Sequence, residues 1–197
     1  KVYDPSKVHP WSSDTMLTND SNHDVQPSIM QALDDKLWVV WSTNRNGNYE
    51  IYYKTSSDNG ATWSSPDQNL TANPNVDEHP SIMQAANGTI WLVWSTNRTA
   101  GTYYIYYKTS SDNGATWSSD QQIFSQRELN NRDPSIMQDS DGKIWVVWDS
   151  DRILEQVDIY YNYKAYDGIW SGDQRLTIHS ADDIMPSIMQ AENGPIW

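Results

Sequence analysis

Three arginines recur at a nearly constant interval, and each directly follows a polar residue with a side-chain oxygen. The three pairs, spaced by 53 and 54 residues, are Asn44-Arg45, Asn97-Arg98 and Asp151-Arg152. The planar guanidinium fork suits the binding of a carboxylate. These six residues are therefore the candidate ligand-binding positions. Their recurrence favours a structural role, because equivalent residues of a repeat are arrayed and do not converge on one ligand.

Carboxylates and imidazoles gather just before four copies of one short peptide. They are Asp24, Asp77, Glu78, Asp133, Asp182, Asp183, His23, His79 and His179. They differ between copies, as the residues of a binding site would, although solvated loop carboxylates are the simpler interpretation. Their spacing matches no metal-binding motif, and no phosphate-binding glycine loop is present. We expect no metal and no cofactor, and assign no catalytic residue.

The peptide Pro-Ser-Ile-Met-Gln sets the period of the chain. Its copies, at intervals of 53, 54 and 52 residues, are Pro27–Gln31, Pro80–Gln84, Pro134–Gln138 and Pro186–Gln190. After each copy come a turn and an apolar run, such as residues 37–41, and then a Tyr-rich segment, such as residues 51–55. Since the apolar runs do not alternate with polar residues, we expect strands covered on both faces. One repeat of about 53 residues therefore predicts four strands, the fourth of which is expected from Trp63 to about Thr71 in the first copy.

A second motif closes the Tyr-rich strand of each repeat. Residues 51–65 are identical to residues 105–119, and Asp-Asn-Gly within them predicts a hairpin turn. We expect the aspartates to accept hydrogen bonds from turn amides, and the tryptophans to pack against a sheet. The motif residues are Ser56, Asp58, Gly60, Thr62, Trp63, Ser110, Asp112, Gly114, Thr116 and Trp117. A shorter third copy, residues 166–170, keeps Asp, Gly and Trp.

The pattern Ser-x-Asp-x-Gly-x-Thr-Trp resembles the Asp-box, or BNR repeat, of sialidase-like β-propellers. The resemblance implies an all-β fold, a β-propeller of four-stranded blades with Asp-box hairpins. The chain would form a single propeller domain or a propeller fragment, residues 1–197, with about three complete blades plus two partial ones. Repeat units are expected at residues 11–62, 63–116, 117–169 and, in part, 170–197. In this family the box is a folding element, and ligands sit at the face that carries the loops before the first strand and after the second strand of each blade.

Sialidases hold a sugar carboxylate with three arginines and use a tyrosine activated by a glutamate. This chain departs from that pattern, because its arginines are repeat-equivalent and it lacks an Arg-Ile-Pro motif. Six of its twelve tyrosines also recur within the Tyr-rich segments. We therefore expect a non-catalytic binding or scaffold module with a glycan or protein ligand. The alternatives are a sialidase-type glycoside hydrolase fragment, whose catalytic residues lie mostly outside the chain, and a purely structural or engineered repeat protein.

Composition excludes several classes of partner. The net charge of −13 argues against nucleic acid, whose phosphates require a basic surface. No apolar run reaches membrane-spanning length, so no membrane insertion is expected. Without cysteine there is no disulfide or thiolate site. We expect an exported or cell-surface location. Because the chain starts and stops within predicted strands, we also expect further blades or a second chain to close the ring.

Overall fold

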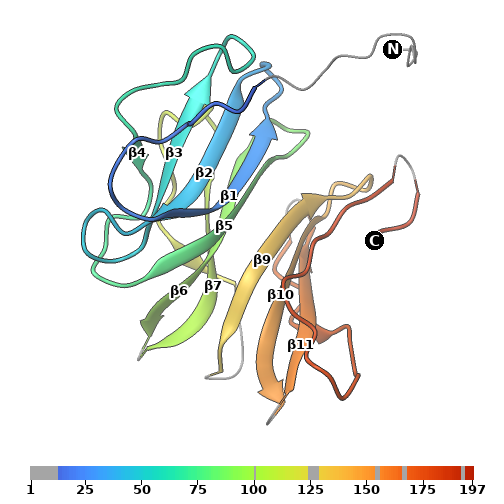
Figure 1. The fold of residues 1–197 in the computed structure, drawn as a ribbon. Helices are drawn as coiled ribbons and strands as arrows, with labels where there is room; N and C mark the ends of the chain where they lie inside the picture. Colours follow the sequence, from blue (N-terminus) through green and yellow to red (C-terminus); the bar gives the residue numbers. More distant parts are fainter. Residues whose placement is uncertain (1–12, 100, 124–128, 154–155, 166–167, 192–193) are drawn as a thin grey trace.

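The computed structural model describes residues 13–99, 101–123, 129–153, 156–165, 168–191 and 194–197. These residues form three antiparallel four-stranded sheets, which we call blades 1 to 3 (Figure 1). Blade 1 contains β1 (Asp24–Gln31), β2 (Leu37–Thr43), β3 (Glu50–Ser56) and β4 (Gln68–Asn69). Blade 2 contains β5 (Asp77–Gln84), β6 (Ile90–Thr99), β7 (Thr102–Ser110) and β8 (Gln121–Gln122). Blade 3 contains β9 (Asn131–Gln138), β10 (Ile144–Ile153), β11 (Gln156–Lys164) and β12 (Gln174–Arg175).

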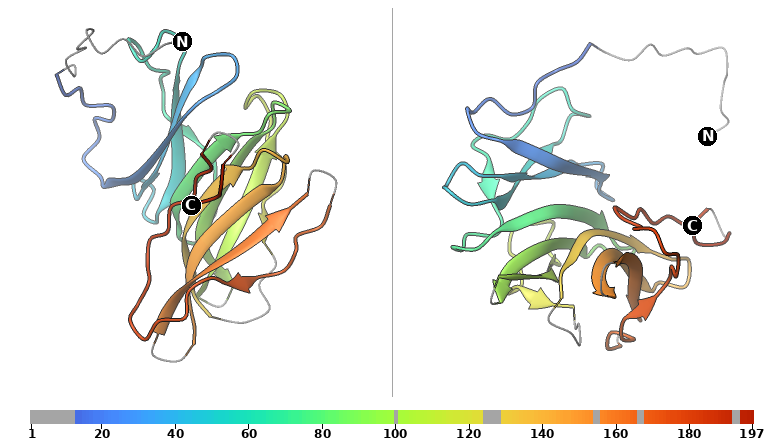
Figure 2. Two further views of the ribbon diagram at one scale, coloured as in Figure 1. Left: turned by 90° about the vertical axis from the view of Figure 1, so that its right-hand side faces the viewer. Right: turned by 60° about the horizontal axis from the view of Figure 1, so that its bottom comes forward.

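The described residues contain strands and turns, and no helix among them could cross a membrane. In every blade the strands pair in chain order, so the first strand is one edge and the short fourth strand is the other. This arrangement confirms the predicted all-β class and the four-stranded repeat unit. The blades follow one another along an arc (Figure 2), and the described part of the chain does not close a ring.

The four copies of Pro-Ser-Ile-Met-Gln lie in a row along the inside of the arc. Ser28 of β1 accepts a hydrogen bond on its Oγ from the backbone amide of Ile82 in β5, at 3.3 Å. The same bond, at the same length, joins Ser81 to Ile136 and Ser135 to Ile188. Each blade therefore meets the next through equivalent atoms. This regular succession is the arrangement expected of a propeller.

The core lies between the blades. The indole of Trp38 in β2 is 2% exposed; it stacks on Tyr53 at 5.0 Å and meets the edge of Trp117 from blade 2 at 6.3 Å. The same contacts recur one blade later, where Trp91 packs on Tyr107 and Trp170. Such ring contacts add about 0.5–1.5 kcal/mol beyond the burial of area. Because both faces of the second strand of each blade are covered, that strand begins with an unbroken apolar run.

The two Asp-box hairpins have the predicted geometry. Asp58 accepts hydrogen bonds from the hydroxyl and the amide of Thr62, at 2.6 and 2.8 Å, and from the hydroxyl of Ser56 at 2.7 Å. These bonds lower the pKa of Asp58 to about 2. Asp112 repeats the arrangement with Thr116 and Ser110.

The shorter third hairpin is described only in part, since residues 166 and 167 lie outside the described residues. Gly168 still closes a turn through its amide, which donates to the carbonyl of Ala165 at 3.0 Å. Trp170 lies edge-on to Trp91 of the preceding blade, at 6.4 Å. The tryptophan therefore keeps its packing role without the serine and threonine of the intact box.

The fourth strand of each blade is shorter than predicted. A strand from Trp63 to about Thr71 was expected, but β4 covers only Gln68 and Asn69. The strands β8 (Gln121–Gln122) and β12 (Gln174–Arg175) are equally short although no proline precedes them, so Pro66, just before β4, does not set this length. Outside β4, Ser64 donates to the carbonyl of Thr55 and Leu70 to that of Ile51, both at 2.8 Å. Of the two predicted partial blades, one begins within residues 1–12, outside the described residues, and the other shows a single bridge between Gln190 and Ile196.

Candidate functional site

The first strand of each blade lies on the inside of the arc and is called the inner strand. It bulges at the residue that precedes the repeated proline. In β5, His79 and Pro80 together face one residue of β6, between the pairs Glu78–Ser95 and Ser81–Val93. The residue before each proline adopts a left-handed backbone, with φ between 51° and 56°; these residues are Gln26, His79, Asp133 and Met185. A non-glycine residue in this region costs about 1–3 kcal/mol. Bulges of this kind redirect side chains.

The four bulged residues and their prolines line one shallow depression of about 330 Å³. It lies at the start of the inner strands, close to the ends of the second strands. The resemblance to sialidase-like propellers had pointed to this face for a ligand. Because the bulge is common to all copies while the bulged residue changes, each blade presents a different side chain to the depression.

Hydrogen bonds join the bulged residues of blades 1, 2 and 3. The backbone amide of His79 donates to Oε1 of Gln26 at 3.1 Å, so the amide nitrogen of Gln26 faces Nε2 of His79 at 2.8 Å. Nε2 then accepts a hydrogen bond from this amide, and the imidazole carries a hydrogen on Nδ1. Nδ1 contacts the carboxylate of Asp133. The imidazole of His79 is therefore oriented from both sides.

Asp149 of β10 completes this group, which we call the central cluster: Gln26, His79, Asp133 and Asp149. The carboxyl of Asp149 is 6% exposed; it accepts a hydrogen bond from the amide of Met185 at 3.1 Å and is hydrogen-bonded to Asp133. Burial is the main cause that raises the pKa of Asp149 to about 7, and the charge of Asp133 adds to it. Burial is the largest single influence on Asp133 and opposes its ionisation, but the interactions with His79, the hydrogen bond with Asp149 and the charge of Arg132 together lower that pKa. The pair therefore shares one proton near neutral pH.

A second set of side chains, the flanking group, adjoins the central cluster: Glu78, Tyr103 and Arg132. Oε1 of Glu78 lies 3.9 Å from Nε2 of His79, and the guanidinium of Arg132 lies 4.1 Å from the ring centre of Tyr103. Burial raises the pKa of Tyr103, and the neighbouring Glu78 raises it further. Tyr103 is therefore a neutral phenol at neutral pH and is not activated as a nucleophile.

The three predicted arginines hold their own blades together. Arg98 pairs with Asp77 of the inner strand at 2.9 Å and with Asp120, which lies just before the fourth strand. Trp94 donates its indole hydrogen to the same Asp77 at 3.0 Å. The equivalent clamps join Arg45 to Asp24 and Asp67, and Arg152 to Asn131 and Asp173. The structure therefore does not bring the three guanidinium groups together, and a ligand role for them remains a prediction.

The residues that precede these arginines fix the start of the inner strand. Each accepts a hydrogen bond on its side-chain oxygen from a backbone amide 21 residues away. The pairs are Asn44 with His23 at 3.0 Å, Asn97 with Val76 at 2.9 Å and Asp151 with Asn130 at 2.8 Å. The six candidate ligand-binding residues thus all make contacts within their own blade.

Of the described acidic and imidazole candidates, His79 and Asp133 line the depression, and Glu78 adjoins it through its contact with His79. Asp24 and Asp77 belong to the arginine clamps. Asp182 and Asp183 bond to the backbone of Val157, and the side chains of His23 and His179 are exposed. His79 was predicted in a connection, but it is the bulged residue of β5. Among the described residues, no three histidine or carboxylate side chains are arranged to hold a metal ion.

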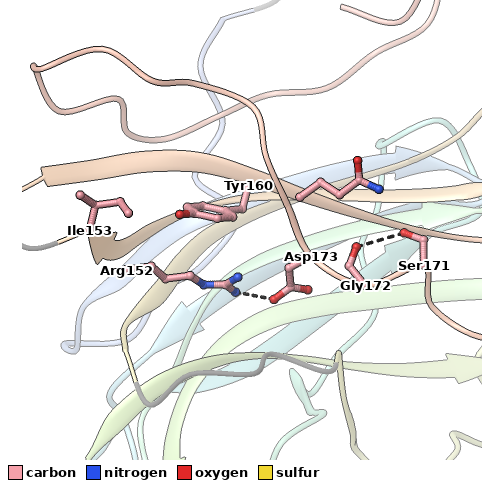
Figure 3. Close-up of a pocket in the computed structure, with 7 residues that line it drawn as sticks. Arg152, Ile153, Tyr160, Ser171, Gly172 and Asp173 are labelled. Atoms are coloured by element: carbon pink, nitrogen blue, oxygen red, sulfur yellow. Dashed lines mark hydrogen bonds and ion pairs between the residues drawn. The ribbon is translucent and has the colours of Figure 1, made fainter.

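A larger hollow of about 420 Å³ lies beside Arg152 in blade 3 (Figure 3). Its charged groups pair with one another, since the guanidinium of Arg152 lies 2.5 Å from the carboxylate of Asp173. The same clamp recurs at Arg45 and Arg98, so this hollow accompanies the scaffold of a blade. The depression at the central cluster differs between blades, and it is the better candidate site.

Sequence reasoning missed Gln26 and Asp149. Asp149 occupies the position that Ser42 and Ser95 hold in the other blades, after the second tryptophan of the apolar strand. A search for departures from the repeat would have found it. Gln26 aligns with His79 and Asp133, but an amide before a proline carries no chemical signal of its own.

The family model of the BNR repeat-like domain matches residues 2–146. Among solved structures, a protein of unknown function from Dyadobacter fermentans DSM 18053 is 13% identical, with a TM-score of 0.73 over 90% of this chain and 62% of that chain. An alpha-L-arabinanase of Penicillium chrysogenum, complexed with arabinobiose, is 17% identical, with a TM-score of 0.70 over 88% of this chain and 56% of that one.

The Hadza microbial sialidase Hz136 is 16% identical, with a TM-score of 0.67 over 88% of this chain and 41% of the enzyme. This chain thus spans less than two thirds of each of these proteins, and at such low identity the likeness shows the fold alone. No curated protein sequence matches it. With intact Asp-box hairpins, three successive propeller blades and a family match over most of its length, the chain belongs to the BNR repeat-like domain family.

Proposed function

We propose that this chain is a glycan-binding propeller module, which holds carbohydrate at the central cluster without cleaving it. One observation carries the proposal. The scaffold contacts repeat from blade to blade, whereas the side chains at the depression change, from Gln26 to His79 to Asp133. Amide, imidazole and carboxylate groups are the partners that sugar hydroxyls bind. The names of the arabinanase and the sialidase, as carbohydrate-acting proteins, support the same ligand class.

The geometry of the carboxyl groups supports binding over catalysis. Asp133 and Asp149 are hydrogen-bonded to each other. In glycosidases the two catalytic carboxyl groups stand about 5–9.5 Å apart, on either side of the scissile bond. The raised pKa of Tyr103 also argues against Tyr103 as a nucleophile.

A glycan array followed by calorimetry on the best ligand tests the proposal. His79→Ala removes the imidazole that joins three blades, and binding is expected to weaken at least about tenfold. Asp141→Asn is the matched control, because Asp141 is 75% exposed on the turn after β9. Absence of any glycan ligand, or full affinity in a folded His79→Ala variant, would refute the proposal. A protein ligand found instead would support the scaffold alternative.

A glycoside hydrolase is the second candidate, and the proton shared by Asp133 and Asp149 favours it. Two carboxyl groups with pKa values displaced in opposite directions are the usual equipment of an acid–base pair. Aryl arabinofuranosides and aryl sialosides provide the assay. Turnover that disappears in Asp149→Asn would replace the binding proposal by a catalytic one.

We also propose an exported or cell-surface location, where a glycan ligand is accessible, and cell fractionation tests it. Further blades, or a second copy of the chain, are proposed to cover the face of blade 1 that is turned away from blade 2. Ile29 supports this, since it is 64% exposed and lines a hollow on that face together with Val39 and Trp63. Light scattering coupled to gel filtration distinguishes a monomer from a dimer.

A further inference from the structure

The central cluster and the flanking group together present mostly negative charge. Glu78, Asp133 and Asp149 contribute three carboxyl groups around the imidazole of His79. Arg132 is the cation that stacks beside them, over the ring of Tyr103. Even with one proton shared by the two aspartates, the carboxylates of Glu78 and Asp133 outnumber this single guanidinium.

The other arginines described on this face are engaged elsewhere. The side chains of Arg45, Arg98 and Arg152 are 18%, 17% and 9% exposed, and each is bound to carboxylates of its own blade. Moving one of them to the depression would leave a buried aspartate without its partner; Asp77, for example, is fully buried. Such an uncompensated buried charge is strongly unfavourable.

From this distribution of charge we infer that the site selects neutral sugars and rejects acidic ones, such as sialic and uronic acids. The inference rests on the proposed glycan-binding function and specifies its ligand class. Sugar hydroxyls can donate to the carboxylates of Asp133 and Glu78, which accept hydrogen bonds and have no hydrogen to give when ionised. A sugar carboxylate would meet those same oxygens as a like charge. Discrimination here comes from repulsion of the wrong ligand as well as attraction of the right one.

Matched pairs of glycans test the inference. Neutral oligosaccharides, and the same oligosaccharides extended by one sialic or glucuronic acid residue, are compared on an array and then by calorimetry. At low ionic strength the acidic member of each pair is expected to bind at least about tenfold more weakly. The gap should narrow as salt is added, because salt screens the repulsion.

Two charge-neutralising variants independently test the ratio between the affinities for the neutral and the acidic member of each pair. Asp133→Asn and Glu78→Gln are each expected to narrow the gap between the neutral and acidic members, and Asp141→Asn is expected to leave it unchanged. Since the ratio is measured, a general loss of affinity does not obscure the result, and Glu78→Gln serves if Asp133→Asn fails to fold. Acidic members that bind as tightly as their neutral counterparts would overturn the inference while the glycan-binding proposal stands. Absence of binding by every glycan would overturn both.

Discussion

A methyl group added at Gly114 should destabilise this protein more than the same methyl group added at Gly60. The two glycines occupy the same place in identical hairpins and have φ values of +83° and +86°. Alanine in this left-handed region costs about 1–2 kcal/mol at either position. The local penalty is therefore matched, and any difference comes from the surroundings.

The surroundings differ because the hairpin of blade 2 packs against Trp38 of blade 1, whereas among the described residues no preceding blade packs against the hairpin of blade 1. A Cβ at Gly114 would lie 2.8 Å from Cζ2 of Trp38, and closer still to Cη2 of the same ring. At Gly60 the nearest atoms, on Leu37 and Trp63, are 3.8 Å away, an ordinary contact. Overpacking against a buried ring adds about 1–3 kcal/mol. Gly114→Ala should thus lower the free energy of unfolding by about 2–5 kcal/mol, and Gly60→Ala by about 1–2 kcal/mol.

Equilibrium unfolding in urea, followed by far-UV circular dichroism and tryptophan fluorescence, measures the difference. Adding Trp38→Phe to Gly114→Ala should recover part of the loss, since the smaller ring withdraws from the new methyl group. Equal losses at the two glycines would refute the reasoning, because they would mean that the hairpin of blade 2 does not press on Trp38 in solution.

Three further outcomes are expected. Asp112 has its pKa lowered from 3.8 to about 2, so its stabilising effect is present above pH 4 and lost as the pH falls towards 2; Asp112→Asn should flatten this part of an acid-denaturation curve. Asp149 has a raised pKa, so the folded state holds an extra proton between about pH 4 and 7, and the free energy of unfolding falls as the pH rises through that window. Asp149→Ser restores the residue found in the other repeats and should remove this fall, as measured by melting temperatures across the window. Arg98→Ala leaves Asp77 buried without its cation and should cost about 3–5 kcal/mol in urea unfolding, whereas the exposed Lys143→Ala should cost under about 0.5 kcal/mol.

Those elements whose bonds are short-range in sequence were predictable. The contacts of Asp58 span two to four residues, so residue type and spacing determine them. The period of the chain was equally informative, because repeated apolar runs require repeated partners. The fourth strand is shorter than predicted in all three blades, because only two of its residues pair with the third strand.

The site was less predictable, because its members come together only in the folded chain. Gln26 and His79 are 53 residues apart, and Asp149 belongs to a different strand from Asp133. The arginines were candidates because a guanidinium binds carboxylates. Their actual partners lie 21 or 22 residues away, in strands and loops whose register the sequence does not specify. Departures from the repeat, at Asp149 above all, were a better guide than the residues that recur.

The bulge before each proline has a consequence for how such a protein changes over time. Its backbone is the same whether the residue is glutamine, histidine, aspartate or methionine. Exchanging that single residue therefore alters what the centre of the arc offers to a ligand, while the tryptophan packing between blades is left untouched. Ligand preference and folding depend on different positions, so a substitution at the bulge can change the ligand preference while the fold is kept.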